Sequence, residues 1–236
     1  MTLLQLHGLV PSTSARNADA PAHRLFRCDS LGALVSGLCA DFDFDNPDDL
    51  ESYAKLHHNI LLAYCAQGPV LPMAIGSVFS SEHALSAALA QRQPEHLRAL
   101  DAISKMGEYA VQVVPKEQFV SSNHVPLTGR EFLRARKVKR DERRDLKVRQ
   151  IVFTRDLMAQ LQKLSLKECP ATAKPGRLLD QTILIGNDAV SKLRELATVS
   201  HQSACDLSLE FKVTGPWPPY SFDPSDVSVM ESRSAG

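Results

Sequence analysis

The chain has no excess of charge of either sign and no long apolar run. Its 27 Lys and Arg residues equal its 27 Asp and Glu residues over 236 positions, so no overall field draws in nucleic acid or anionic membrane. No apolar run approaches the roughly 18–20 residues that cross a bilayer, which predicts that there is no membrane span. The N-terminus lacks the basic region of a secretory signal, and we therefore predict none.

Paired cysteines are also missing. The five cysteines are widely spaced, and none forms a C-x-x-C pair. This pattern predicts a reduced, cytoplasmic protein with isolated thiols and excludes a zinc knuckle or a disulfide framework. The isolated thiols are Cys28, Cys39, Cys65, Cys169 and Cys205.

Motifs that carry chemistry are absent as well. The sequence has neither G-x-G-x-x-G nor a Walker loop, and "AIGSVFSS" is no nucleophile elbow because Ala74 occupies the first glycine position. The acidic stretch "DFDFDNPDD" lacks the spacing and the final Glu of a calcium-binding loop. We therefore predict a protein that is not an enzyme and that holds no cofactor or metal.

The first half of the chain predicts an α+β domain. Apolar runs at 3–10 and 107–115 favour strands, whereas 24–38 fits two strands or a strand and a short helix. "VLPMAIGSVF", residues 70–79, predicts a buried strand with an early proline. Two helices are expected between 81 and 106. We assign residues 1–120 to an N-terminal ferredoxin-like domain.

A helix is predicted to begin after Asn46. Asn46 can cap it, Pro47 suits its first position, and Asp48 and Asp49 favour the positive end of its dipole. One stripe of this helix carries residues at helical spacing, which predicts its buried face. The stripe comprises Leu50, Tyr53, Ala54, His57, Leu61 and Tyr64.

The second half predicts a smaller α+β domain that a long helix enters. Between 129 and 165 glycine occurs only at the first position and proline not at all, which predicts one helix of roughly 50 Å. Its second half carries an apolar seam of Ile151, Leu157, Leu161 and Leu164. A strand, a helix and a final strand follow. This domain is assigned to 121–222, and the polar residues 223–236 predict a disordered tail.

Adjacent histidines, His57 and His58, lie in the first predicted helix. Neighbours in a helix point about 100° apart, whereas two metal ligands on a helix need a spacing of three or four. His57 falls on the apolar stripe, so we interpret it as a hydrogen-bonded core residue. His58 is expected to be exposed or to face a neighbouring element. A catalytic or metal-binding pair is the alternative.

The strongest local charge excess lies between Arg134 and Arg149, with nine Lys or Arg against three Asp or Glu. No aromatic residue interrupts this run, which disfavours nucleic-acid binding. We interpret it as a solvated or protein-docking helix face, with Arg136, Arg140 and Arg143 as candidate contact residues. A nucleic-acid or acidic-surface binding module is the alternative.

The stretch "TGPWPPYSF" gathers the only tryptophan with three prolines. Pro216 has no amide proton to continue a strand ladder, and Pro218 and Pro219 favour an extended path. Trp217, Tyr220 and Phe222 can bury large areas, so this stretch is either a clamp over the core, most simply over the second domain, or an aromatic docking edge.

Several motifs together resemble the GvpF/GvpL family of gas vesicle proteins. They are "YAKLHHNILLAY", "VLPMAIGSVF", "GEYAVQV", "TGREFLRARK" and "GPWPPYSF", in that order in the chain. Members often carry Arg where this chain has Ile75. The resemblance covers about Leu3 to Phe222.

The resemblance implies two α+β domains and no catalytic activity. It also implies an accessory or minor structural protein of gas vesicles that contacts the hydrophobic shell protein GvpA and other accessory proteins. Such a protein would limit the aggregation of GvpA or help to nucleate the shell. No nucleic-acid partner is expected from it.

Overall fold

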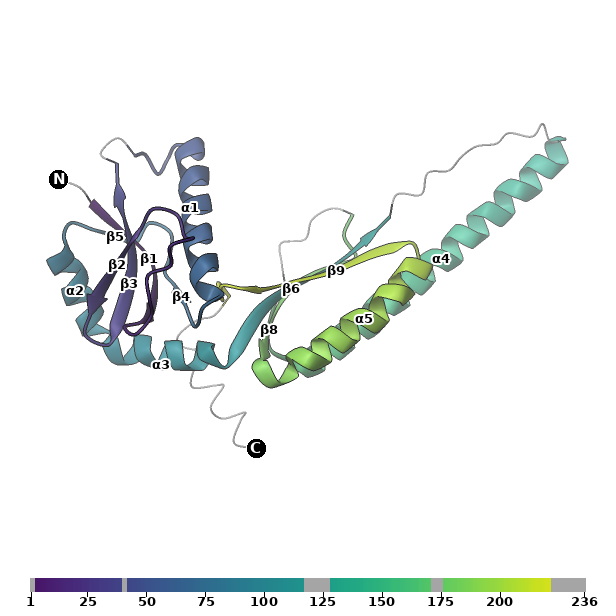
Figure 1. Ribbon diagram of the computed structural model, residues 1–236. Helices are drawn as coiled ribbons and strands as arrows, with labels where there is room; N and C mark the ends of the chain where they lie inside the picture. The colour runs from purple at the N-terminus through teal and green to yellow at the C-terminus, as the bar shows by residue number, and fades with distance from the viewer. Residues whose placement is uncertain (1–2, 40–41, 117–127, 171–175, 222–236) are drawn as a thin grey trace. The chain divides into compact units, whose positions relative to one another are not determined.

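The computed structural model describes residues 3–39, 42–116, 128–170 and 176–221. Contacts divide the chain into two compact units (Figure 1). The first unit comprises Met1–Glu108 and Pro216–Gly236, and the second comprises Tyr109–Gly215. Each unit combines helices with an antiparallel sheet, so the predicted α+β class is confirmed.

The first unit is built on a sheet with the strand order β2-β3-β1-β4, in which β5 also pairs with β1. Its strands are β1 (Leu3–Pro11), β2 (Arg24–Cys28), β3 (Leu31–Leu38), β4 (Leu71–Pro72) and β5 (Val78–Phe79). Its helices are α1 (Pro47–Cys65), α2 (Glu82–Gln91) and α3 (Gln93–Ser104). Residues 24–38, which the sequence left open, therefore form a strand pair.

Helix α1 begins where its sequence predicts. The Asn46 side chain accepts a hydrogen bond from the Asp48 amide at 3.0 Å, and Pro47 occupies the first turn. Its buried face packs on β1 and β3, where Ile60, Leu61 and Tyr64 join Val10 and Leu34 in one core cluster. The predicted stripe is correct at its centre, but Leu50 is exposed because it lies in the first turn, beyond the core.

The strand predicted over 70–79 is wrong in its middle. The chain pairs with β1 at β4 and β5, the Met73 amide and the Ser77 carbonyl add one hydrogen bond each to β1, and a turn separates them. Gly76 has a φ of +87°, and the Ser77 amide donates to the Ala74 carbonyl at 3.1 Å. The positive φ of Gly76 and the hydrogen bond from Ser77 to Ala74 make this segment a turn, in place of the central part of the predicted strand.

The second unit has a sheet with the order β7-β8-β6-β9. Its strands are β6 (Met106–Pro115), β7 (Ser165–Pro170), β8 (Leu179–Gly186) and β9 (Leu209–Trp217). Its helices are α4 (Gly129–Leu164), the 3₁₀ turn η1 (Asn187–Ala189) and α5 (Val190–Asp206). The core of this unit includes Leu157, Leu161, Ile183, Leu193 and Leu209.

Helix α4 confirms the uninterrupted helix predicted over 129–165, but its apolar seam needs one correction. Leu157 and Leu161 are buried and Leu164 packs beside them, whereas Ile151 is 62% exposed. A helix turns by about 100° per residue, which places Ile151 about 120° from Leu157 and about 80° from Leu161 around the helix. Ile151 therefore lies on a second face of α4.

Two strands lie elsewhere than the sequence suggested. We placed β6 with the first sheet, yet it pairs between β8 and β9 in the second. The sequence also predicted that Pro216 ends the last strand, whereas β9 continues to Trp217 through Gly215, whose φ is +136°. From Pro216 on, the chain is counted with the first unit. The aromatic stretch that we expected on the second domain therefore packs on the first.

Gly8 marks the closest approach of β1 to α1. A β-carbon there would lie 2.5 Å from Leu61 Cδ2 and 3.0 Å from the Leu71 carbonyl oxygen. We expect Gly8→Ala to lower the free energy of unfolding by about 2 kcal/mol through overpacking, as measured by urea denaturation. Gly68→Ala is the control, because no atom lies within 4 Å of the added carbon. Equal effects of the two substitutions would contradict this close packing.

Candidate protein-binding pocket beside helix α1

A pocket of about 490 Å³ lies in the first unit. One wall is the side of α1 that carries Ala54, His57 and His58, and a second wall is the turn after β4. Tyr220 closes the third side. The residues that line the second wall are Pro72, Met73, Ala74 and Ile75. Ile75 and Tyr220 are 49% and 44% exposed, so the rim presents apolar surface to solvent.

A β-bulge places the first polar residue behind this pocket. The register between β1 and β3 shifts between Leu6 and Gly8, so that His7 is the extra residue. A bulge re-aims a side chain relative to the regular alternation of a strand. His7 is fully buried, and its ring lies 5.3 Å from the His57 ring, centroid to centroid.

The buried histidines form a chain of hydrogen bonds. Ser36 Oγ donates to Gln5 Oε1 at 3.2 Å, and it lies 2.8 Å from His7 Nε2. Because the hydroxyl proton of Ser36 is used in the hydrogen bond to Gln5, His7 Nε2 donates to the Ser36 oxygen. His7 Nδ1 then accepts a hydrogen bond from the Nδ1–H group of His57 at 3.3 Å. The hydrogen-bond directions thus assign a neutral tautomer to each histidine and leave His57 Nε2 as an acceptor.

Both histidines are held neutral by their surroundings. Burial, with smaller contributions from the neighbouring His57 and His23, lowers the pKa of His7 from 6.5 to about 4. Burial also lowers the pKa of His57 from 6.5 to about 4, with a smaller contribution from His58. This confirms the interpretation of His57 as a hydrogen-bonded core residue.

The C-terminal segment packs against the neighbouring histidine. His58 Nδ1 lies 2.8 Å from the Tyr220 hydroxyl, and the two rings stack at an interplanar angle of 28°. The Trp217 ring lies 5.8 Å from the His58 ring, centroid to centroid. His58 therefore faces a neighbouring element, which was one of its two expected environments. Of the two interpretations of "TGPWPPYSF", these contacts fit a clamp, and Tyr220 also contributes to the exposed rim.

A buried carboxylate fixes the end of this segment. Glu108 is 5% exposed, and one of its oxygens accepts a hydrogen bond from the Ser221 amide at 2.9 Å. Burial and, to a smaller extent, the charge of Glu108 raise the pKa of the Tyr220 hydroxyl. Burial also raises the pKa of the Cys65 thiol, and Glu108 again adds to the shift. Tyr220 and Cys65 are therefore protonated at neutral pH.

The candidate residues from the sequence fall in both units. Tyr220 lines the pocket in the first unit, Trp217 packs against His58 in the same unit, and Phe222 lies outside the described residues. Arg136, Arg140 and Arg143 are exposed on α4 in the second unit. Arg136 covers the Phe132 ring at 5.7 Å, and Arg140 lies 3.7 Å from Asp141.

Sequence reasoning missed His7 and Met73. His7 has a signal in the sequence, because it is, with Gln5, one of two polar residues in a largely apolar strand and it precedes a glycine. Such a residue needs a buried partner. Met73 has no local signal, since only the turn after β4 brings it to the pocket.

The two histidines of the pocket are engaged in contacts within the first unit. The Nδ1 atoms of His57 and His58 are used in contacts with His7 and Tyr220. Within residues 3–39, 42–116, 128–170 and 176–221, no group of three His, Cys, Asp or Glu residues could hold a metal ion. No helix in the same part of the chain is long and apolar enough to span a membrane. All five cysteines are free, as predicted.

Comparison with known proteins assigns the family. Residues 8–224 match the family described as "Gas vesicle synthesis protein GvpL/GvpF". The chain belongs to this family. The resemblance drawn from its motifs is thereby confirmed.

Relatives and solved structures agree with this assignment. The chain is 25% identical to gas vesicle protein L2 of Halobacterium salinarum, over 96% of this chain and 91% of the relative. It is 27% identical to gas vesicle protein F of a Streptomyces species, over 80% of this chain and 86% of the relative.

Two crystal structures share its fold. GvpF from Anabaena has a TM-score of 0.65 at 15% identity, over 94% of this chain and 95% of that one. GvpF from Microcystis aeruginosa has a TM-score of 0.61 at 14% identity, over 94% of this chain and 99% of that one.

Proposed function

We propose that this protein is a non-enzymatic accessory protein of gas vesicle assembly that binds the hydrophobic shell protein GvpA. In this role it limits the aggregation of GvpA or helps to nucleate the vesicle. Membership of the GvpL/GvpF family supports the process. The pocket beside α1 supports the binding, and its exposed apolar rim is the observation on which the proposal rests.

The pocket has the properties of a docking site for an apolar side chain. Its volume of about 490 Å³ exceeds that of one large side chain, and Met73 can adapt its shape to different occupants. Phe44 extends the apolar rim, since it is 38% exposed and its Cε1 lies 3.7 Å from the site of a β-carbon on Gly76. Exposed apolar surface of this kind marks interaction sites.

The test uses GvpA diluted from denaturant into buffer with and without this protein, followed by light scattering. We expect the protein to suppress scattering and Ile75→Asp to weaken the suppression about fivefold, because a carboxylate at the rim must be desolvated. Val199→Asp is the matched control, since Val199 is an exposed apolar residue of the second unit.

The outcomes separate the function from the site. If the unaltered protein leaves the aggregation of GvpA unchanged and does not co-purify with it, the proposed function is wrong. If the protein suppresses aggregation and Ile75→Asp does so equally well, the function stands and the pocket is not the binding site.

A further inference from the structure

The N-terminal half of α4 lacks packing against the described part of the chain. From Gly129 to Arg149 no side chain is buried, and the first buried residue is Gln150. This stretch is about 30 Å long at 1.5 Å per residue. Figure 1 shows α4 continuing past the end of α5 within the second unit.

The exposed half is nevertheless built as a defined helix. Thr128 and Glu131 form a capping box at its start, in which Glu131 Oε2 accepts from the Thr128 amide at 3.1 Å. The Thr128 hydroxyl donates to the same oxygen at 2.7 Å. These hydrogen bonds lower the pKa of Glu131. The helix therefore begins at a fixed position, about six turns before its first buried residue.

One face of α4 carries a continuous stripe, which we call the α4 stripe. Its members follow each other at intervals of three or four residues, with two consecutive intervals of four at Arg144. Such spacing keeps side chains on one side of a helix. The α4 stripe comprises Leu133, Lys137, Arg140, Arg144, Val148, Ile151, Arg155, Met158 and Gln162. It lies about 120° from the face that Leu157 and Leu161 bury.

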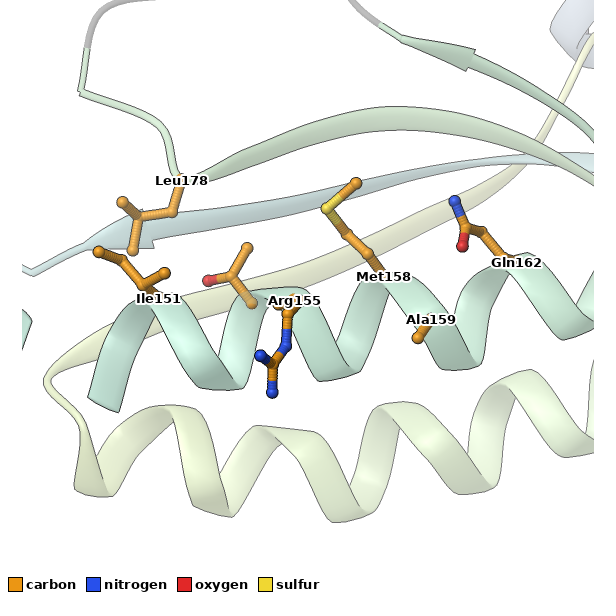
Figure 2. A pocket seen from close by; sticks show the side chains of 7 residues that line it. Ile151, Arg155, Met158, Ala159, Gln162 and Leu178 are labelled. Atoms are coloured by element: carbon orange, nitrogen blue, oxygen red, sulfur yellow. The ribbon is translucent and has the colours of Figure 1, made fainter. Parts of the chain in front are cut away.

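The C-terminal part of the α4 stripe borders an apolar groove. This groove has a volume of about 400 Å³ and is lined by Ile151, Met158, Ala159 and Leu178, together with polar side chains. Figure 2 shows Leu178 across from Ile151, with Met158 projecting from the helix toward the same side. Ile151 and Leu178 are 62% and 37% exposed. The α4 stripe therefore carries cations from Lys137 to Arg144, whereas its groove end is mainly apolar, with Arg155 as the one cation there.

The charge of the chain is distributed unevenly around this surface. Nine basic and three acidic residues lie between 134 and 149, although the whole chain has 27 of each. This run thus carries an excess of six positive charges, and the remainder of the chain carries six negative ones. A second copy that paired α4 stripe to α4 stripe in parallel would place cations against cations, and an antiparallel pair would place the cations of each copy over the apolar groove of the other, so neither arrangement matches the stripe.

We propose that the α4 stripe docks an acidic amphipathic helix of a partner protein. Apolar side chains of that helix fill the groove at Ile151, and its carboxylates face Lys137, Arg140 and Arg144. Nucleic acid fits less well, because no aromatic residue lies between 134 and 149 and because phosphates would leave the groove empty. This inference is independent of the pocket in the first unit.

Among the three arginines selected from the sequence, only Arg140 belongs to this surface. Arg136 and Arg143 are rotated by about 80–100° from the centre of the α4 stripe. That rotation supplies a matched control. Lys139 and Arg143 repeat the spacing of Arg140 and Arg144 one residue earlier, and hence about 100° around the helix.

The experiment measures binding of a fluorescein-labelled peptide of about 28 residues, with Leu at positions a and d and Glu at positions e and g of each heptad. Fluorescence anisotropy gives the affinity of the full chain. We expect the double variant R140E/R144E to bind about tenfold more weakly, and I151D to weaken binding similarly. The control K139E/R143E should change the affinity less than threefold. Added salt should affect the charged contacts more than the groove.

Each outcome decides the proposal. Absence of peptide binding overturns it, because the surface then does not bind an acidic amphipathic helix. Equal losses of affinity in R140E/R144E and K139E/R143E also overturn it, because binding then does not depend on the α4 stripe. Tighter binding of a DNA duplex of about 20 base pairs than of the peptide also overturns it and assigns the cations to phosphate. All variants lie at exposed positions, and thermal unfolding verifies that they fold.

Discussion

Lowering the pH from 8 to 5 is expected to remove about 4 kcal/mol from the free energy of unfolding of the first unit. The pKa values of His7 and His57 are about 4 in the folded protein, against 6.5 for an unperturbed histidine. At pH 5 both histidines are therefore mostly protonated in the unfolded chain and mostly neutral in the folded chain. Linkage converts this difference into about 2 kcal/mol for each histidine.

The direction of this stability change and the pH range over which it occurs follow from the same two pKa values. A lowered pKa in the folded state gives stability that is complete above pH 6.5 and that is lost as the pH falls toward 4. His96 acts in the same sense, because burial lowers its pKa too. The exposed carboxylates Glu51 and Glu131 have lowered pKa values below 4.5 and therefore act at lower pH.

The measurement is urea denaturation at several pH values, followed by the fluorescence of Trp217. This residue is the only tryptophan and lies in the first unit, so its signal reports that unit. We expect His57→Gln to lose about half of the pH-dependent change, whereas the exposed His83→Gln should retain all of it. An equal pH dependence of His57→Gln and the unaltered protein would contradict the buried histidine pair.

Local signals in the sequence predicted the elements but not their partners. Asn46 and Pro47 determine the start of α1, and the absence of proline determines the length of α4, because caps and breakers act over a few residues. The alternating apolar pattern of 107–115 correctly predicts β6. The same pattern is compatible with either sheet, and only long-range pairing places β6 between β8 and β9.

The candidate site was predictable only where local sequence patterns determine it. His57 could be interpreted from its place on an apolar stripe, a property of α1 alone. The hydrogen bond of His58 with Tyr220 joins residues 162 positions apart, and no local pattern encodes it. The docking of Trp217 on the first unit depends on the return of the chain after β9. A local analysis therefore assigned this aromatic segment to the wrong unit.

The second large effect is expected from removing the clamp itself. Ending the chain after Gly215 removes Trp217 and Tyr220, which pack against α1, together with the buried Pro218 and Pro219. It also removes the hydrogen bond from Ser221 to the buried Glu108. We expect the first unit to lose about 4 kcal/mol relative to a chain that ends after Ser221. The difference between the two truncations isolates residues 216–221.

Circular dichroism during urea denaturation measures this difference, since the shorter chain has no tryptophan. Trp217→Ala should account for about 2 kcal/mol of it, because the half-buried indole packs against His58. Tyr220→Phe should account for about 1 kcal/mol, the net contribution of its hydrogen bond. A difference below 1 kcal/mol between the truncated chains would show that the segment does not clamp the first unit. Trp217 and Tyr220 would then be available for partner binding instead.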